Sequence, residues 1–453
     1  MKKSLLALSL LATFAGSAMA NVSVYGVLDV GFGFENHKID KFPGITAQAQ
    51  QELIDSGVLK LDQKNNSFKM TKDWYAGPRF GLTGSEKVSD NLSVCFKLES
   101  GFSPLNGALN NLLFQRESTL NAATPFGTVY VGHMGVIRGG AGSVGFFNSQ
   151  ANPFGGGWDD VIGGVSPFTS DFAARVNNGI AYVSPTISDL KIYAQYSGGE
   201  TDSQNKSTDD RYMALGALFS HDKLNVAAVI DTTILGNGAQ YNPLTLTYTA
   251  KAKPSEDLKV VADSPKKNPI SFNVAANYEF DAFKLYGSAQ YFKNAKNVTN
   301  SITGAVTLPK DTTATIRLND VAPIFNRLMD PKKNTLKAVS PDTKAAVYTK
   351  ENATYKYDGF GLTTGISAPL ANGTIYASIG YMQAKGYDYL GTKYQVSKLT
   401  RYGIGLGYDY KLSQRTTVYA GIGGIQDTWK AVEFDAKVKQ HIYQAGFGLS
   451  HKF

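Results

Sequence analysis

The sequence predicts an all-β fold: a transmembrane antiparallel β-barrel of about sixteen strands, with short periplasmic turns and long extracellular loops. In many segments apolar and polar residues alternate with a period of two, the pattern of a strand with two unlike faces. The connections between these segments are alternately short and long. Beyond the N-terminus, no segment offers the roughly 18 uninterrupted apolar residues that a membrane-spanning helix needs.

The N-terminus has the composition of a cleaved export signal. Lys2 and Lys3 form a basic region, and an apolar stretch follows at residues 5–14. Ala18-Met19-Ala20 then fits the small-x-small pattern of a cleavage site. We therefore expect residues 1–20 to be a signal peptide and residues 21–453 to form a single exported barrel domain.

The first strand is expected directly after this segment. Between residues 22 and 34, large apolar side chains occupy one face, and polar residues and glycines occupy most of the other. Such a strand presents one face to lipid and the other to a polar lumen. Comparable segments recur along the chain, approximately at 22–34, 75–86, 91–102, 113–124, 127–134, 175–185, 189–198, 211–221, 223–233, 270–280, 282–293, 356–369, 373–384, 399–411, 415–427 and 440–453.

The last strand is the most informative element. Tyr443, Ala445, Phe447, Leu449 and Phe453 fall on one face. Ten residues separate Tyr443 from Phe453, which is roughly 33 Å along an extended strand. Tilted by about 40°, such a strand crosses roughly 25 Å of membrane, the height of the apolar band on outer-membrane barrels. Phe453 is therefore expected to be the lower anchor of a lipid-facing stripe.

The connections predict that the two ends of the barrel differ. Such asymmetry is typical of outer-membrane barrels, whereas a soluble sandwich has no reason to show it. Short turns are expected at 87–91, 125–127, 220–223, 280–282, 370–373 and 412–415, and long polar loops at 35–72, 135–174, 235–268 and 295–355.

Composition excludes several classes of protein. The chain is 43% hydrophobic and 18% charged, which disfavours intrinsic disorder. The formal net charge is +8, but Lys and Arg are scattered and form no nucleic-acid-binding motif, so no nucleic-acid partner is expected. Cys95 is the one cysteine, so no intramolecular disulfide can form; we expect it to be a small packed residue.

Five stretches resemble the general porins of β-proteobacteria and neisseriae. Each stretch is short, but together they run in order along the mature chain. They are residues 24–29 (VYGVLD), 79–86 (RFGLTGSE), 96–102 (FKLESGF), 126–132 (FGTVYVG) and 446–453 (GFGLSHKF).

This resemblance implies a sixteen-stranded homotrimer with one pore per subunit. It also implies that the third long loop, about 135–174, folds back into the barrel and narrows it; Asn152-Pro153-Phe154-Gly155 is similar to the motif of that loop. Two features depart from the family: Cys95 is unusual, and the loops at 35–72 and 295–355 are longer than usual.

A pore performs no covalent chemistry, and its functional site is a charged constriction that sorts solutes by charge. The acidic candidates are on the loop: Asp159, Asp160 and Asp171. The basic candidates are Arg79 and Lys97, which alternation places on the polar face, Arg116, which matches a family arginine although it shares a face with Leu120, and Arg138 and Arg175 at the two ends of the loop.

Enzymatic motifs are weak, and we expect no catalysis, cofactor or metal. Residues 140–145 match G-x-G-x-x-G, but no helix pattern follows, so a dinucleotide site lacks its structural context. The five histidines lack metal-binding spacing, and no G-x-S-x-G nucleophile motif is present.

The predicted function is passive diffusion of small hydrophilic solutes and ions across the outer membrane of a Gram-negative bacterium. The expected partners are two further copies of the chain, outer-membrane lipid and the insertion machinery, which in this family recognises a terminal aromatic such as Phe453. The positive charge favours anions but does not settle the selectivity. Two alternatives stay open: an adhesion barrel that binds through loops 35–72 and 295–355, and a solute-selective porin with aromatic side chains leading into its pore.

Overall fold

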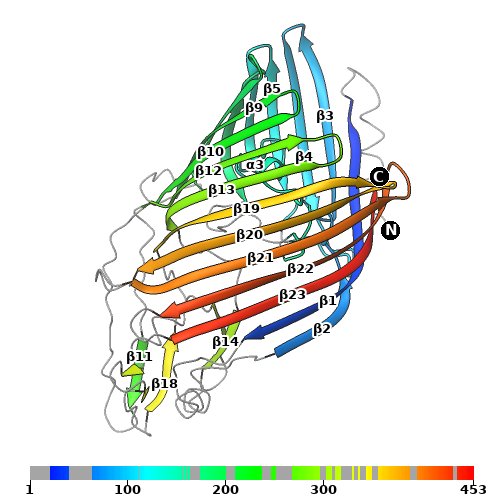
Figure 1. Cartoon of the computed structure of the whole chain (residues 1–453). Coiled ribbons are helices and arrows are strands. Elements are labelled where there is room, and N and C mark those ends of the chain that lie inside the picture. Colours follow the sequence, from blue (N-terminus) through cyan, green and yellow to red (C-terminus); the bar gives the residue numbers. More distant parts are fainter. Residues whose placement is uncertain are drawn as a thin grey trace, which may run out of the picture.

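The barrel wall is a closed antiparallel sheet of sixteen strands (Figure 1). The computed structural model describes residues 21–39, 64–110, 112–155, 157–159, 161–163, 174–199, 210–236, 246–250, 268–295, 303–308, 312–317, 329–330, 335–336, 343–348, 356–387, 395–431 and 436–453. The wall strands are β1 (Ser23–Ile39), β3 (Arg79–Ser89), β4 (Leu92–Gly101), β5 (Glu117–Thr124), β6 (Gly127–Gly135), β7 (Arg175–Val183), β8 (Leu190–Ser197), β9 (Arg211–His221), β10 (Leu224–Ile234), β12 (Ile270–Glu279), β13 (Lys284–Ala295), β19 (Lys356–Leu370), β20 (Gly373–Tyr387), β21 (Gln395–Lys411), β22 (Thr416–Ala431) and β23 (Ala436–Lys452).

The remaining elements are not part of the sixteen-strand wall. β2 is an additional strand that pairs with β1, and α3 is a short helix in the loop after β6. The other strands form two-stranded sheets. These elements are β2 (Lys64–Thr71), α3 (Phe147–Ala151), β11 (Leu246–Ala250), β14 (Thr303–Leu308), β15 (Thr312–Arg317), β16 (Met329–Asp330), β17 (Thr335–Leu336) and β18 (Thr343–Tyr348).

Each wall strand pairs with the next wall strand along the chain, and β23 closes the ring by pairing with β1 from Val27↔Lys452 to Ile39↔Gln440. This closure pairs the first wall strand with the last, so neither is left as an open sheet edge in lipid, where an unpaired backbone group would cost several kcal/mol. The α-helices in the described part of the chain are too short to span a membrane.

Side-chain alternation separates a lipid face from a lumen face, as predicted. On β23, Tyr443, Phe447 and Leu449 are exposed, whereas the intervening Gln444 and Ser450 are buried inside the barrel. The same holds on β1, where Phe32 and Phe34 point outward and Asp29 points inward. The outward apolar side chains are the surface that lipid tails would solvate.

All sixteen predicted strand segments correspond to wall strands, with ends that differ by a few residues. The largest differences are of two kinds: β1 and β22 extend to Ile39 and Ala431, whereas β3 and β5 begin later than predicted, at Arg79 and Glu117. The prediction ended each strand where apolar alternation ended, but strands can continue into water with polar residues on both faces. β2 was missed because it lies in the predicted loop 35–72; it pairs with Gly31–Phe34 and with the polar extension Glu35–Lys38 of β1.

β2 and β3 both pair with the same side of β1. β3 pairs with Ser23–Val27, and β2 pairs with Gly31–Lys38. Residues 72–78 join the two strands and leave the wall, because Asp73 adopts a left-handed backbone (φ 68°) and Pro78 has no backbone N–H to donate. The wall is therefore interrupted beside the seam at which β1 and β23 close the ring.

Candidate functional site

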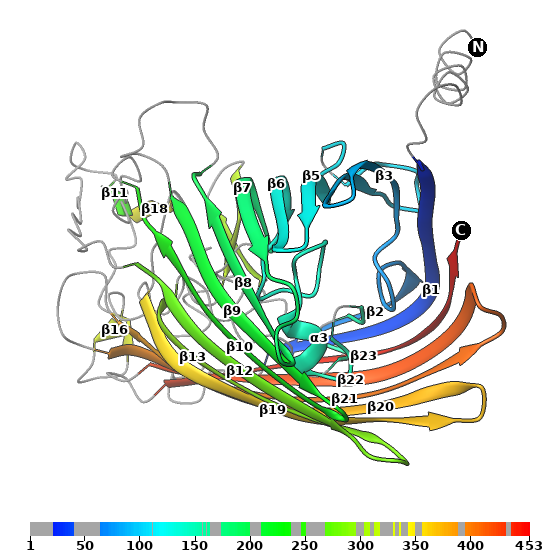
Figure 2. The same ribbon diagram turned by 90° about the horizontal axis from the view of Figure 1, so that it is seen from above.

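The loop after β6 packs against the inside of the barrel (Figure 2). Its apolar residues Val136, Ile137, Val144, Phe146 and Phe147 are buried against inward-facing side chains of β7 to β12. Those wall positions are mostly small, which leaves room for the loop without breaking the close packing of the interior. The small wall residues in this contact are Ala181, Ala214, Ala227 and Ala275.

Glycines on the inner wall form seats for the loop. A side chain at Gly216 on β9 would meet the Phe146 ring at 3.0 Å, and one at Gly365 on β19 would meet Pro153 at 2.7 Å. Further along, Gly407 on β21 lies beneath Phe154 and Trp158, and Gly421 on β22 beneath Ile162 and Trp158. The described part of the loop therefore follows the wall from β6 to β22.

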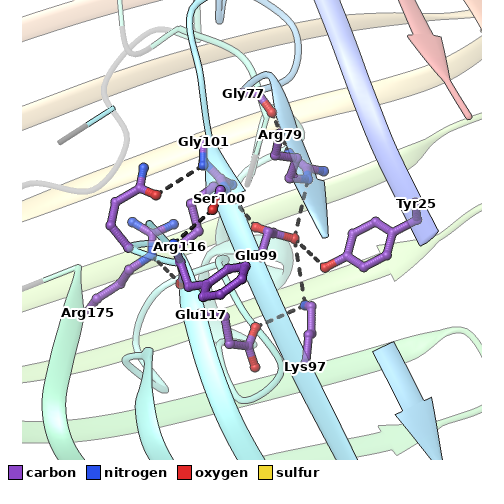
Figure 3. A network of polar contacts seen from close by, with 12 residues as sticks. Tyr25, Gly77, Arg79, Lys97, Glu99, Ser100, Gly101, Arg116, Glu117 and Arg175 are labelled. Atoms are coloured by element: carbon purple, nitrogen blue, oxygen red, sulfur yellow. Dashed lines mark hydrogen bonds and ion pairs between the residues drawn. The ribbon is translucent and has the colours of Figure 1, made fainter. Parts of the chain in front are cut away.

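The basic cluster is a polar network on the wall, which the loop touches at Glu117 through the backbone N–H of Ser143 (Figure 3). It comes from β1, β3, β4, β5 and β7, and Glu99 on β4 lies at its centre. We define the cluster as Arg79, Lys97, Arg116 and Arg175 with the acids Glu99 and Glu117.

Glu99 contacts three cations and a phenol. Arg116 Nε donates to Glu99 Oε1 at 2.6 Å, and the Tyr25 hydroxyl donates to Oε2 at 2.8 Å. Arg79 Nε and Lys97 Nζ lie 3.7 and 3.9 Å from the same oxygen. Glu99 thus holds together cations that would otherwise repel one another.

The remaining contacts fix the edges of the cluster. Lys97 Nζ lies 2.9 Å from Glu117 Oε2, and Arg175 Nε donates to the backbone carbonyl of Arg116 at 2.7 Å. Arg79 also donates to the carbonyl of Gly77 at 2.8 Å. The cluster therefore touches the segment between β2 and β3.

Exposure within the cluster is unequal. The side chains of Arg79, Lys97 and Arg116 are 27%, 25% and 20% exposed, whereas Glu99 is 8% and Glu117 0% exposed. The cations therefore reach the water of the lumen, and the acids lie behind them.

The sequence left open to which side of the wall Arg116 points, and the structure shows why. Leu120 on β5 points outward, which would place Arg116 outward on a continuous strand. However, β5 begins only at Glu117, and Phe114 has a left-handed backbone with φ 56°. Alternation does not extend past the start of a strand, so Arg116 turns inward to Glu99.

Arg138 differs from the expectation of a pore-lining arginine. It is buried, and its Nε donates to Asp231 Oδ2 at 2.9 Å. The Tyr212 hydroxyl donates to the same oxygen at 3.1 Å. Arg138 therefore ties the start of the loop to β10 and β9.

Asp159 also has a local role. Its carboxylate accepts a hydrogen bond from the backbone N–H of Val161 at 2.9 Å, which closes a turn of the loop. Burial raises the pKa of the Asp159 carboxyl above its ordinary value, against the lowering effect of its backbone hydrogen bonds. Asp160 and Asp171 lie outside the described residues.

Glu99 and Glu117 were missed as site residues because the prediction placed the acids of the constriction on the loop. Glu99 has the same parity as Lys97 two residues earlier, which identifies its face. Nothing local indicates that Glu117 would approach Lys97, since that pairing depends on the register of β4 with β5.

An aromatic group lies against β20 and β22. Tyr75 stacks on Tyr419 with centroids 5.1 Å apart, and Trp158 lies 5.1 Å from Tyr75 and 5.7 Å from Tyr376, in both cases edge to face. The hydroxyls of Tyr75 and Tyr376 both donate to the buried carboxylate of Asp409, at 2.9 and 2.7 Å. Among the described residues, no group of histidine, cysteine and acidic side chains is arranged to hold a metal ion.

Comparison with known proteins agrees with this architecture. A family profile described as Gram-negative porin matches residues 7–428. An outer membrane porin protein of Bordetella pertussis is 28% identical over 299 residues, which cover 63% of this chain and 68% of the relative.

The fold is also that of a solved porin. The structure of the anion-selective porin from Comamonas acidovorans aligns with 96% of this chain and 100% of its own, with a TM-score of 0.54 and 15% identity. The outer membrane channel DcaP of Acinetobacter baumannii aligns with 97% of this chain and 100% of its own, with a TM-score of 0.49 and 14% identity.

Proposed function

This chain belongs to the Gram-negative porin family, and we propose that its pore sorts solutes by charge and prefers anions. The protein is an outer-membrane pore for passive diffusion of small hydrophilic solutes, and it is a channel rather than an enzyme. Its location is the outer membrane of a Gram-negative bacterium. Small anions are therefore expected to carry more of the current than cations of similar size.

The unequal exposure of the basic cluster carries the anion preference. Four cations and two acids leave a formal charge of +2. A solute in the lumen meets the partly exposed Arg79, Lys97 and Arg116 before it meets either acid. Charges act over a Debye length of about 8 Å at physiological salt, so the cluster affects solutes in the narrow passage more than charges on distant loops do.

Three acids on the inner wall weaken this field little, because each is buried and bonded to neighbours. Asp231 contacts Arg138, Asp427 contacts Arg401, and Asp409 accepts from two tyrosines. This pattern supports a cation-lined passage in which acids mainly position other groups. Of the predicted loop carboxylates, Asp159 bonds to the backbone of the loop itself, and Asp160 and Asp171 lie outside the described residues.

We propose three further properties from the resemblance to general porins. Residues 1–20 are removed as a signal peptide, and residues 21–453 assemble as a single barrel domain. Three copies form a homotrimer in outer-membrane lipid. The insertion machinery recognises the terminal strand through Phe453.

The aromatic group favours a second candidate function, a porin selective for solutes with an apolar face. Tyr75, Trp158 and Tyr376 are each only partly buried, so ring edges remain available beside the passage. Such a solute would reduce the ionic current in a saturable manner, whereas a purely general pore would show no saturation.

Purified protein in a planar lipid bilayer tests the diffusion pore. We expect stepwise current increases, an ohmic current–voltage relation at low voltage, and conductance that rises with bulk salt, because ions cross a water-filled passage without a binding step. Vesicles that contain the protein should also swell in small neutral sugars. A correctly folded barrel that conducts no ions at either sign of the applied voltage would contradict the proposal.

A further inference from the structure

We propose that the 72–78 segment between β2 and β3 is a clamp that fixes the far end of the inserted loop relative to the basic cluster. Trp74 and Tyr75 act in it as positioning residues that set the width and steadiness of the passage. This inference rests on the proposed diffusion pore. It adds a determinant of conductance that comes from outside the loop.

Trp74 anchors the clamp to the wall. Its side chain is buried, and its indole lies over Gly33 on β1 and Gly446 on β23, where a Cβ atom on either glycine would overlap the ring. Both glycines face inward, since their neighbours Phe32, Phe34 and Phe447 face out. The indole therefore occupies a slot across the seam that closes the barrel.

The same segment holds the loop. The backbone carbonyl of Trp74 accepts a hydrogen bond from the N–H of Asp159 at 3.1 Å. Tyr75 contacts Trp158 edge to face at 5.1 Å. A side chain at Gly157 would approach the Tyr75 carbonyl to 2.7 Å, so loop and segment lie in close backbone contact.

Tyr75 adds a second anchor on the wall. Its hydroxyl donates to the Asp409 carboxylate on β21, and its ring stacks on Tyr419 of β22. The hydroxyl of Tyr419 in turn donates to the carboxylate of Asp29 on β1 at 2.9 Å. Wall strands on both sides of the seam thus hold the segment.

The other end of the segment contacts the basic cluster. The carbonyl of Gly77 accepts a hydrogen bond from Arg79 at 2.8 Å, and a Cβ on Gly77 would lie 3.1 Å from the Arg116 guanidinium (Figure 3). One short segment therefore links residues 157–163 of the loop, which we call the loop tip, to the cations. If this link loosens, the distance between the two sides of the passage is no longer fixed.

Single-channel recording tests the clamp. Removing a buried tryptophan changes the equilibrium between the seated and the unseated segment by a factor of about 100 or more. Trp74→Ala should therefore raise open-channel noise and make brief closures frequent. Tyr75→Phe keeps the ring but removes one charge-assisted hydrogen bond, and a smaller change, about tenfold in closing frequency, is expected. The reversal potential should stay close to that of wild type because the cations remain.

Phe447→Ala is the matched control, because Phe447 neighbours Gly446 on the same strand but faces lipid. Noise and closures in Trp74→Ala and Tyr75→Phe that equal those of Phe447→Ala would overturn the proposal. If Trp74→Ala fails to assemble, the comparison of Tyr75→Phe with the control still decides.

Thiol labelling tests the clamp without any current. In a Cys95→Ala background, a cysteine at Val161 reports whether the loop tip is seated. Its labelling should be slow with Trp74 present and at least about tenfold faster with Trp74→Ala. Equal labelling rates would refute the clamp even in a conducting channel, whereas faster labelling in a protein that conducts no ions would refute only the diffusion pore.

Discussion

At the scale of single residues, Phe453 completes the closure of the barrel. Its backbone N–H donates to the carbonyl of Gly26 at 3.1 Å, and its carbonyl accepts from the N–H of Gly26 at 3.0 Å. Its ring lies over Gly26, where a Cβ atom would overlap it. The terminal residue therefore extends the β1–β23 seam, and its ring covers Gly26.

This seam predicts a matched pair of assembly defects. Deletion of Phe453 and Gly26→Leu should both lower the yield of folded trimer, because each removes the same ring contact. Molecules that do assemble should keep near-normal single-channel conductance, since the ring contact lies on the lipid side of the wall.

Heat-modifiable migration on gels measures that yield. Phe126→Ala is the control, because Phe126 is an exposed aromatic on a short turn, away from the seam. Normal trimer yield after deletion of Phe453 would contradict both the seam contact and the proposed recognition by the insertion machinery.

Alternation identified Arg79 and Lys97 as lumen residues because both lie within regular strands. The same rule was insufficient for Arg116, which precedes its strand, and for Arg138, whose partner Asp231 lies on a distant strand. The side of the sheet on which a residue lies is a local property, because side chains alternate sides along a strand. The partner of a charged side chain depends on register and on loop packing, neither of which is local.

At the scale of elements, the inner-wall glycines determine how close the loop lies to the wall. Gly421 on β22 would place a Cβ atom 2.6 Å from the Ile162 side chain and 3.0 Å from Trp158. Gly421→Val should therefore push the loop tip into the passage and lower the single-channel conductance. The overpacking should also destabilise the barrel by about 1–3 kcal/mol.

Gly287→Val on β13 provides the control for this change, because nothing lies within 4 Å of a Cβ atom there. Single-channel conductance and urea unfolding should distinguish the two variants. Equal conductance in Gly421→Val, Gly287→Val and wild type would show that the loop tip does not border the passage.

The elements themselves were largely predictable, because lipid on one side and water on the other impose strict alternation. β2 (Lys64–Thr71) was not, since it lies in a polar loop and half of its pairing is with Glu35–Lys38, a strand extension with polar residues on both faces. The path of the inserted loop along glycine seats was also beyond prediction. Several of those seats lie on strands that are hundreds of residues from the loop in sequence.

At the scale of the whole molecule, the lumen has two unlike sides. From β7 to β22 the wall is covered by the inserted loop, and its acids are paired and buried. From β3 to β5 the wall carries the exposed cations of the basic cluster. The 72–78 segment joins these sides across the seam, so one short segment relates the shape of the pore to its charge.

The reversal potential in a salt gradient tests whether the basic cluster makes the pore prefer anions. The current through the wild-type pore should reverse at a potential whose sign shows that anions cross more readily than cations. A variant with Arg79→Gln, Lys97→Gln and Arg116→Gln should lose most of that potential. Glu99→Gln should increase it, because one acid behind the cations is removed, and Lys87→Gln at the exposed end of β3 should leave it unchanged. A cation-selective wild type, or a potential that these cluster substitutions do not move, would contradict the account.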